Sequence, residues 1–228
     1  MLRTIAAVPY LNQRRRTLRV TLAVLVYCFL LGQTLLGQSA PNLYRVGPNQ
    51  WVAGLPSVGI TRLAAPETFG RQRRENWCWA ASVQMVLNLA GVQVTQEQVV
   101  QRIFGGDINS GGTVPQIMGA LSGWAFTGTG KSVQLYPSML TNDAEMIDDL
   151  SHGWPIIAAL SNGDGTGHAE VVTAVKFAQG FGNTISLTSV VLRDPWPYNA
   201  SRVEMPYEQF ARRRSAGIRY RVVYPQGY

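Results

Sequence analysis

Cys78 is the side chain best placed for nucleophilic chemistry, because it falls in the first turn of a predicted helix. Residues 77–90 read WCWAASVQMVLNLA, follow Asn76 as a suitable N-cap and end at Gly91. Apolar residues cover most of this segment, which is typical of a central, buried helix. The positive end of a helix dipole favours a thiolate in the first turn. The pattern therefore predicts Cys78 as a nucleophile.

A thiol nucleophile needs a base, and the chain of 228 residues contains two histidines. His168 opens the strand-like run HAEVVTAV after the turn NGDGTG, which leaves its imidazole at a sheet edge. His152 falls in a helix-end segment, where histidine is common. We therefore predict that His168 is the general base.

The second nitrogen of that imidazole needs an acceptor that holds its tautomer and orientation. Asp194 ends the apolar run TSVVLRD and precedes Pro195 and Trp196, so it suits this role. Taken alone, an Asp-Pro pair is more often simply the start of a turn. For the oxyanion, the candidate donors are the backbone N–H of Cys78 and the side-chain amide of Gln72, six residues earlier.

The elements that must position these residues change in character along the chain. Helical signals come first, including a capping box at Thr95–Gln98, and β-branched and aromatic runs follow. This order predicts an α+β fold with a helical half and an antiparallel β half. Besides residues 77–90, the expected helices are 95–104, 113–121 and 142–151, and the expected strands are Pro155–Leu160, His168–Phe177, Thr184–Arg193 and Ile218–Tyr224.

The N-terminal part has the pattern of an export signal. Residues 14–19 read RRRTLR and precede an apolar run at 20–37, so residues 1–39 are interpreted as a signal peptide or an N-terminal membrane anchor. The positive-inside rule then places the rest of the chain across the membrane, as a secreted, periplasmic or membrane-anchored domain. Prolines and glycines in residues 40–65 indicate a linker or lead-in, and residues 66–228 are interpreted as the folded domain.

Charge and cysteine content exclude several classes of protein. The formal charge is +7, but five arginines precede residue 20, and the remainder carries 15 basic against 13 acidic residues. No basic face for nucleic acid is expected on the domain. Cys28 lies in the apolar run, so Cys78 has no partner for an internal disulfide and no cysteine cluster for structural zinc. No metal or organic cofactor is implied.

Four motifs, in order, resemble those of papain-like cysteine peptidases. The stretch Cys78–Ser82 is similar to C-W-A-x-S at the nucleophile, and Gln72 stands where this family keeps its oxyanion glutamine. The run HAEVV from His168 resembles the strand that carries the catalytic histidine. Asp194-Pro195-Trp196 is similar to the N-x-W motif whose asparagine orients that histidine. The resemblance implies a papain-like fold and a peptide or protein substrate.

The departures from papain resemble a compact bacterial branch of the family. The third member is Asp rather than Asn, the separation of 90 residues between Cys78 and His168 is short, and no disulfides accompany the site. These features, with the phrase NWCWAAS, are similar to those of effector proteases delivered into plant cells and of double-glycine leader peptidases. The resemblance covers roughly residues 66–224.

Other functions on the same architecture remain open from the sequence. Cell-wall amidases use Cys and His in the same order but usually show D-C-S-G at the nucleophile, whereas this chain reads N-W-C-W. Transglutaminase-like enzymes share the Cys-His-Asp order, so acyl transfer to an amine is not excluded. A non-catalytic binding module is disfavoured because Cys78, His168 and Gln72 are all present. The sequence therefore predicts a Cys-His-Asp peptidase that forms a thioester acyl-enzyme.

Overall fold

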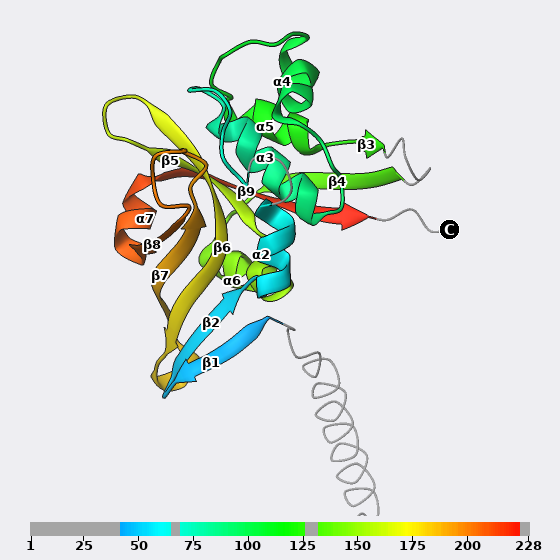
Figure 1. Cartoon of the computed structure of the whole chain (residues 1–228). Helices are drawn as coiled ribbons and strands as arrows, with labels where there is room; N and C mark the ends of the chain where they lie inside the picture. Colours follow the sequence, from blue (N-terminus) through cyan, green and yellow to red (C-terminus); the bar gives the residue numbers. More distant parts are fainter. Residues whose placement is uncertain (1–41, 65–68, 126–131, 224–228) are drawn as a thin grey trace, which may run out of the picture. The chain divides into compact units, whose positions relative to one another are not determined.

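The computed structural model describes residues 42–64, 69–125 and 132–223 (Figure 1). Residues 1–39, with the predicted signal or anchor and the apolar run 20–37, lie outside these ranges. Among the described helices, none combines the length and the apolar character needed to cross a membrane. The described chain is an α+β domain with antiparallel strand pairs, so the predicted fold class is confirmed.

A sheet of nine strands organises the described domain, with neighbours in the order β1-β2-β6-β5-β9-β4-β3 and with β7 joining β6 to β8. Its longest strand, β6, pairs with β5 near its start, with β2 further along and with β7 on the other edge. His168 is the second residue of this strand and pairs with Leu160 of β5. The strands are β1 (Leu43–Gly47), β2 (Gln50–Gly54), β3 (Trp124–Ala125), β4 (Ser132–Met139), β5 (Ile156–Ser161), β6 (Gly167–Gln179), β7 (Ile185–Arg193), β8 (Arg202–Pro206) and β9 (Arg214–Val223).

Local sequence signals explain where three of the described helices begin and where one of them ends. Thr95 and Thr113 each form a capping box with a glutamine three residues later, and Gly105 ends the helix after Thr95 in the left-handed conformation. Asn142 caps the next helix by accepting from the backbone N–H of Glu145. The α-helices are α2 (Ser57–Ala64), α3 (Cys78–Leu89), α4 (Gln96–Phe104), α5 (Val114–Leu121), α6 (Asp143–Ser151) and α7 (Tyr207–Arg213), with a short 3₁₀ turn η1 (Phe181–Asn183).

The sheet is covered by helices on both faces, which produces two apolar clusters. In β5, Ile157 packs in the cluster of α3, α4 and α5, whereas Ile156 and Ala158 pack in the cluster of α6 and α7. Successive side chains of a strand point to opposite faces, so β5 is buried on both. Figure 1 shows α3, α4 and α5 grouped together, with α7 beside β7 and β8. This packing fixes α3 against the sheet that carries His168.

Two sequence-based interpretations need correction. Residues 43–64, expected to be a linker, form β1, β2 and α2, and β2 pairs with β6 over residues 174–178. They belong to the compact unit that spans residues 40–228. Asn76 does not cap α3, because Trp77 occupies that position without a side-chain cap. The backbone N–H of Asn76 instead donates to Asn109 Oδ1 and its side-chain amide to the Asn109 carbonyl.

Candidate active site

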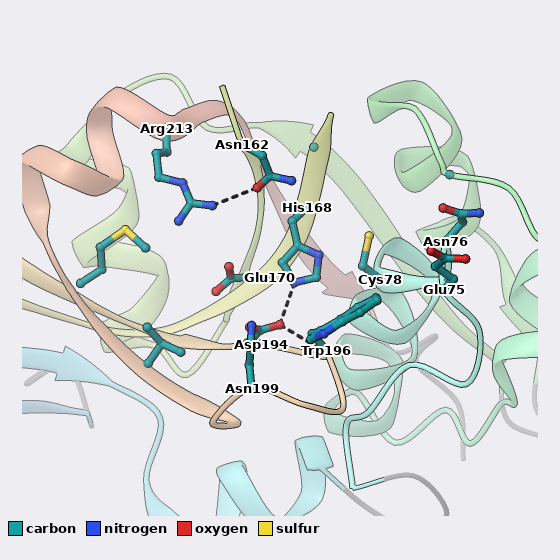
Figure 2. Close-up of a pocket in the computed structure, with 14 residues that line it drawn as sticks. Glu75, Asn76, Cys78, Asn162, His168, Glu170, Asp194, Trp196, Asn199 and Arg213 are labelled. Atoms are coloured by element: carbon teal, nitrogen blue, oxygen red, sulfur yellow. Dashed lines mark hydrogen bonds and ion pairs between the residues drawn. The ribbon is translucent and has the colours of Figure 1, made fainter. Parts of the chain in front are cut away.

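A cavity of about 560 Å³ lies where the first residue of α3 approaches the start of β6. Cys78, His168 and Asp194 all line it, although they come from a helix, a strand and the loop that follows β7 (Figure 2). The structure therefore brings together the three residues predicted as nucleophile, base and orienting group. His152, the other histidine, is at the C-terminal end of α6 and bonds to the Asp148 carbonyl.

Asp194 is held firmly as the partner of the histidine. Its Oδ1 lies 2.7 Å from His168 Nε2 and also accepts the backbone N–H of Trp196 at 2.8 Å. Its Oδ2 accepts from the Asn199 amide at 2.7 Å. Because three donors fix a carboxylate that is 4% exposed, the ring of His168 is oriented with Nδ1 left for Cys78. Asn199 is a site residue that the sequence reading missed.

The protonation states of His168 and Asp194 follow from their contacts. Burial alone would lower the pKa of His168, but hydrogen bonds with Asp194 and Cys78, and the charges of both, raise it to about 10. Burial alone would raise the pKa of Asp194, but hydrogen bonds from His168, Asn199 and Trp196 hold it below its usual range. An imidazolium beside an ionised Asp194 is therefore the favoured state at neutral pH.

Two tryptophans position the start of α3. Trp77 donates its indole N–H to the Ile108 carbonyl and Trp79 donates to the Ser110 carbonyl, both at 2.9 Å. A Cβ on Gly112 would lie 2.5 Å from the Trp79 ring, so only glycine permits this close approach. The loop after α4 thus anchors both neighbours of Cys78 in the sequence.

Gln72 lies apart from the cavity lining in this structure. Its side-chain Nε2 donates to the carbonyls of Arg74 and Glu75, at 2.9 and 2.7 Å, and its buried Oε1 has no hydrogen-bond partner among the described residues. Its backbone N–H donates to the Pro195 carbonyl, which joins its loop to the loop that carries Asp194. The predicted oxyanion role of this amide stays a prediction, since the amide would have to leave these carbonyls to perform it.

Arg71 joins the helical half to the loop 194–199. Its guanidinium donates to the carbonyls of Asp194, Trp196 and Asn199 at 2.7 to 3.0 Å. Its own carbonyl accepts from Gln96, a fully buried residue at the start of α4. Nothing local to residues 71–74 in the sequence indicates these partners, which lie more than 120 residues away.

Glu170 is a further buried carboxyl that the sequence reading did not single out. It follows His168 by two residues, so both side chains lie on the same face of β6. It is 4% exposed and lines the cavity. His168, Glu170 and Asp194 have potential metal-ligand atoms within 4.8 Å of one another, but a cation would have to break the His168–Asp194 hydrogen bond. The sequence signal that could have identified Glu170 is an acidic residue within the otherwise apolar run HAEVV.

A second cavity, of about 430 Å³, adjoins the same pair of residues. Cys78, His168, Gly111 and Gly167 line both cavities. The walls of the second cavity are mainly backbone and apolar side chains, including those of Val114 and Ile117. The thiol and the imidazole therefore border two adjoining cavities, of which only the first is also lined by carboxyl groups and an arginine.

The family of the chain follows from a match over residues 65–227, which fit the model of the Peptidase_C39 like family. The chain belongs to this family. It is a cysteine-type peptidase with a papain-like fold, as the sequence motifs predicted. The match includes Cys78, His168 and Asp194 but not β1, β2 and α2.

Two of the solved structures that resemble this chain come from transporters. The peptidase domain of Streptococcus ComA, a bifunctional ABC transporter of a quorum-sensing pathway, is 18% identical with a TM-score of 0.46, over 68% of this chain and 96% of that one. A double-glycine motif protease from an AMS/PCAT transporter, in complex with the leader peptide, is 22% identical with a TM-score of 0.42, over 68% and 89%. The comparison with curated proteins finds no match.

Replacing Arg71 by lysine should slow this peptidase, because one ammonium cannot bond three carbonyls of the 194–199 loop as the guanidinium does. We expect kcat to fall roughly tenfold to a hundredfold, since a small displacement of Asp194 misaligns His168. Steady-state kinetics should show a larger change in kcat than in KM. Arg62→Lys on α2 is the matched control, and an equal loss in that variant would contradict a specific role for Arg71.

Proposed function

We propose that the enzyme hydrolyses peptide bonds through a Cys78–His168–Asp194 triad. The observation that carries the proposal is the convergence of Cys78, at the first residue of α3, on a histidine whose Nε2 is bound to a buried aspartate. This arrangement has the parts required for nucleophilic catalysis: a thiol, a base within reach and a group that orients the base.

The reaction begins with attack of the Cys78 thiolate on the carbonyl carbon of the scissile peptide. The imidazolium of His168 gives its Nδ1 proton to the leaving amine as the C–N bond breaks, and a thioester remains on Cys78. Neutral His168 then takes a proton from water, which attacks the thioester and releases the carboxylic acid. Asp194 stabilises the imidazolium in both halves of the cycle.

The oxyanion formed in each half needs hydrogen-bond donors near the sulfur. The backbone N–H of Cys78 is one, because the first N–H groups of a helix have no partner within the helix. Gln72 is the second candidate, and we propose that its amide turns from the carbonyls of Arg74 and Glu75 when substrate binds. Its unpartnered Oε1 supports this, since the amide gives up part of its hydrogen-bonding capacity in the resting arrangement.

The proposed substrate is an extended peptide segment. The two cavities continue on either side of Cys78 and His168, as a groove for residues on both sides of a scissile bond requires. One of the similar structures is a protease in complex with a leader peptide. We also propose that the domain acts outside the cytoplasm, on the strength of the arginine-rich segment 14–19 and the apolar run 20–37.

Thiol labelling of the full-length protein tests the proposed triad. A peptidyl vinyl sulfone should alkylate Cys78 faster in the folded than in the denatured protein, because only the folded state places His168 beside the sulfur. Mass spectrometry locates the adduct and distinguishes it from one on Cys28. Labelling of folded Cys78 no faster than of the denatured chain would overturn the proposal.

A further inference from the structure

The proposed mechanism of the triad assigns no role to the carboxyl group of Glu170. It lies on the cavity wall with 4% of its surface exposed, and its buried Oε2 has no hydrogen-bond partner among the described residues. Figure 2 shows it on the side of the His168 ring that faces away from Cys78. A buried carboxylate without a partner destabilises a protein. A partner supplied by the substrate would offset this penalty.

The cations around Glu170 compensate its charge only in part. Asp194 and His168 have side-chain atoms within 4.8 Å, but they are bonded to each other. Arg213 is the remaining cation of the cavity, and its guanidinium is held by the Ser161 carbonyl and by Asn162 Oδ1. Burial, and then the charge of Asp194, raise the pKa of Glu170 to about 7, while His168 and Arg213 act in the opposite direction. An arriving cation would favour the ionised form.

The rest of this cavity suits a long basic side chain. Val203 and Met205 of β8 provide apolar wall, and Glu75 adds a further acidic group to the lining. The second cavity has no acidic side chain in its lining. Methylene groups can therefore pack against β8 while a charged end reaches the buried carboxylate, as lysine and arginine side chains do at partly apolar surfaces.

We propose that Glu170 is a specificity-determining residue that selects peptides with a lysine or arginine in the cavity beside His168. The proposal rests on the proposed peptidase function and adds the substrate class. The cation pairs with the carboxylate of Glu170 at the cavity wall, and its stem contacts Val203 and Met205.

The test uses the full-length protein and a mixed peptide library, with cleavage sites read by mass spectrometry. Lysine and arginine should be enriched at one position near the scissile bond. Replacing that lysine by norleucine, which lacks the ammonium group, should lower kcat/KM by roughly a hundredfold. Glu170→Gln should bring the lysine-to-norleucine ratio close to one. In the unmodified enzyme this ratio should fall between pH 8 and pH 6, because protonation of Glu170 removes its charge.

Glu208→Gln is the matched control, because this carboxylate on α7 is exposed and lies outside the cavity lining. It should leave the ratio unchanged. Cleavage with no preference for basic residues, or a ratio that Glu170→Gln does not change, would overturn this inference and leave the triad standing. Absence of all cleavage together with slow labelling of Cys78 would overturn the triad and this inference with it. The norleucine comparison needs no variant, so it holds even if Glu170→Gln folds poorly.

Discussion

Cys78→Ala is expected to abolish peptide hydrolysis, with kcat/KM lowered roughly 10⁴-fold or more, because no thioester can form without the sulfur. The change removes one atom from a partly exposed position, and the two tryptophans that anchor α3 stay in place. The unfolding midpoint should therefore stay close to that of the parent protein. Cleavage of a library-derived peptide and thermal unfolding measure the two quantities.

Cys28→Ser provides the matched control for this prediction. Cys28 lies in the apolar run 20–37, outside the described residues, and the proposed mechanism assigns it no role. Its substitution should preserve turnover. Full activity in Cys78→Ala, or an equal loss in both variants, would contradict the assignment of Cys78 as nucleophile.

His168→Ala should cause a loss of similar size, again roughly 10⁴-fold, because both proton transfers depend on this imidazole. It should also slow alkylation of Cys78 towards the rate of an ordinary cysteine. In the double variant Cys78→Ala/His168→Ala the loss should be no greater than in either single variant, because the residues act as one unit. Turnover and labelling rates of the three variants measure this coupling.

The pH dependence of stability reports the contacts of His168 with Asp194 and Cys78. Its pKa is raised to about 10 in the folded state, so its contribution to stability is fully present below about pH 6.5 and is lost as the pH rises through 10. The difference in unfolding free energy between the parent and His168→Ala should shrink over this range. His152→Ala, at the exposed end of α6, is the control and should preserve activity.

Local signals made much of the helical half predictable. The capping boxes at Thr95 and Thr113 and the cap at Asn142 lie within four residues of the groups that they satisfy. The β-branched runs likewise predicted β5, β6 and β7 to within two residues at each end, whereas β9 begins at Arg214, four residues before the predicted start. The residue types, their places in the expected elements and the resemblance to papain-like motifs predicted Cys78, His168 and Asp194 as one site, and all three line one cavity.

The structural features that the sequence did not predict depend on partners far along the chain. Residues 50–54 form a strand that pairs with residues 174–178, whereas the prolines and glycines of residues 40–65 suggested a linker. Pro137 concealed β4, although it can lie within that strand because β3 pairs with residues 132 and 133 alone. Arg71 contacts the loop after β7, and Glu170 lines the cavity. Residues nearby in the sequence indicate neither of these placements.

The pairing of β2 with β6 also has a consequence for where this domain can be cut. The family match begins at residue 65, after β1, β2 and α2. A fragment that begins there would lose the strand that covers residues 174–178 of β6. The uncovered N–H and C=O groups would form an open sheet edge, which readily recruits strands from other molecules. The hairpin of β1 and β2 thus protects the strand that carries His168 against self-association.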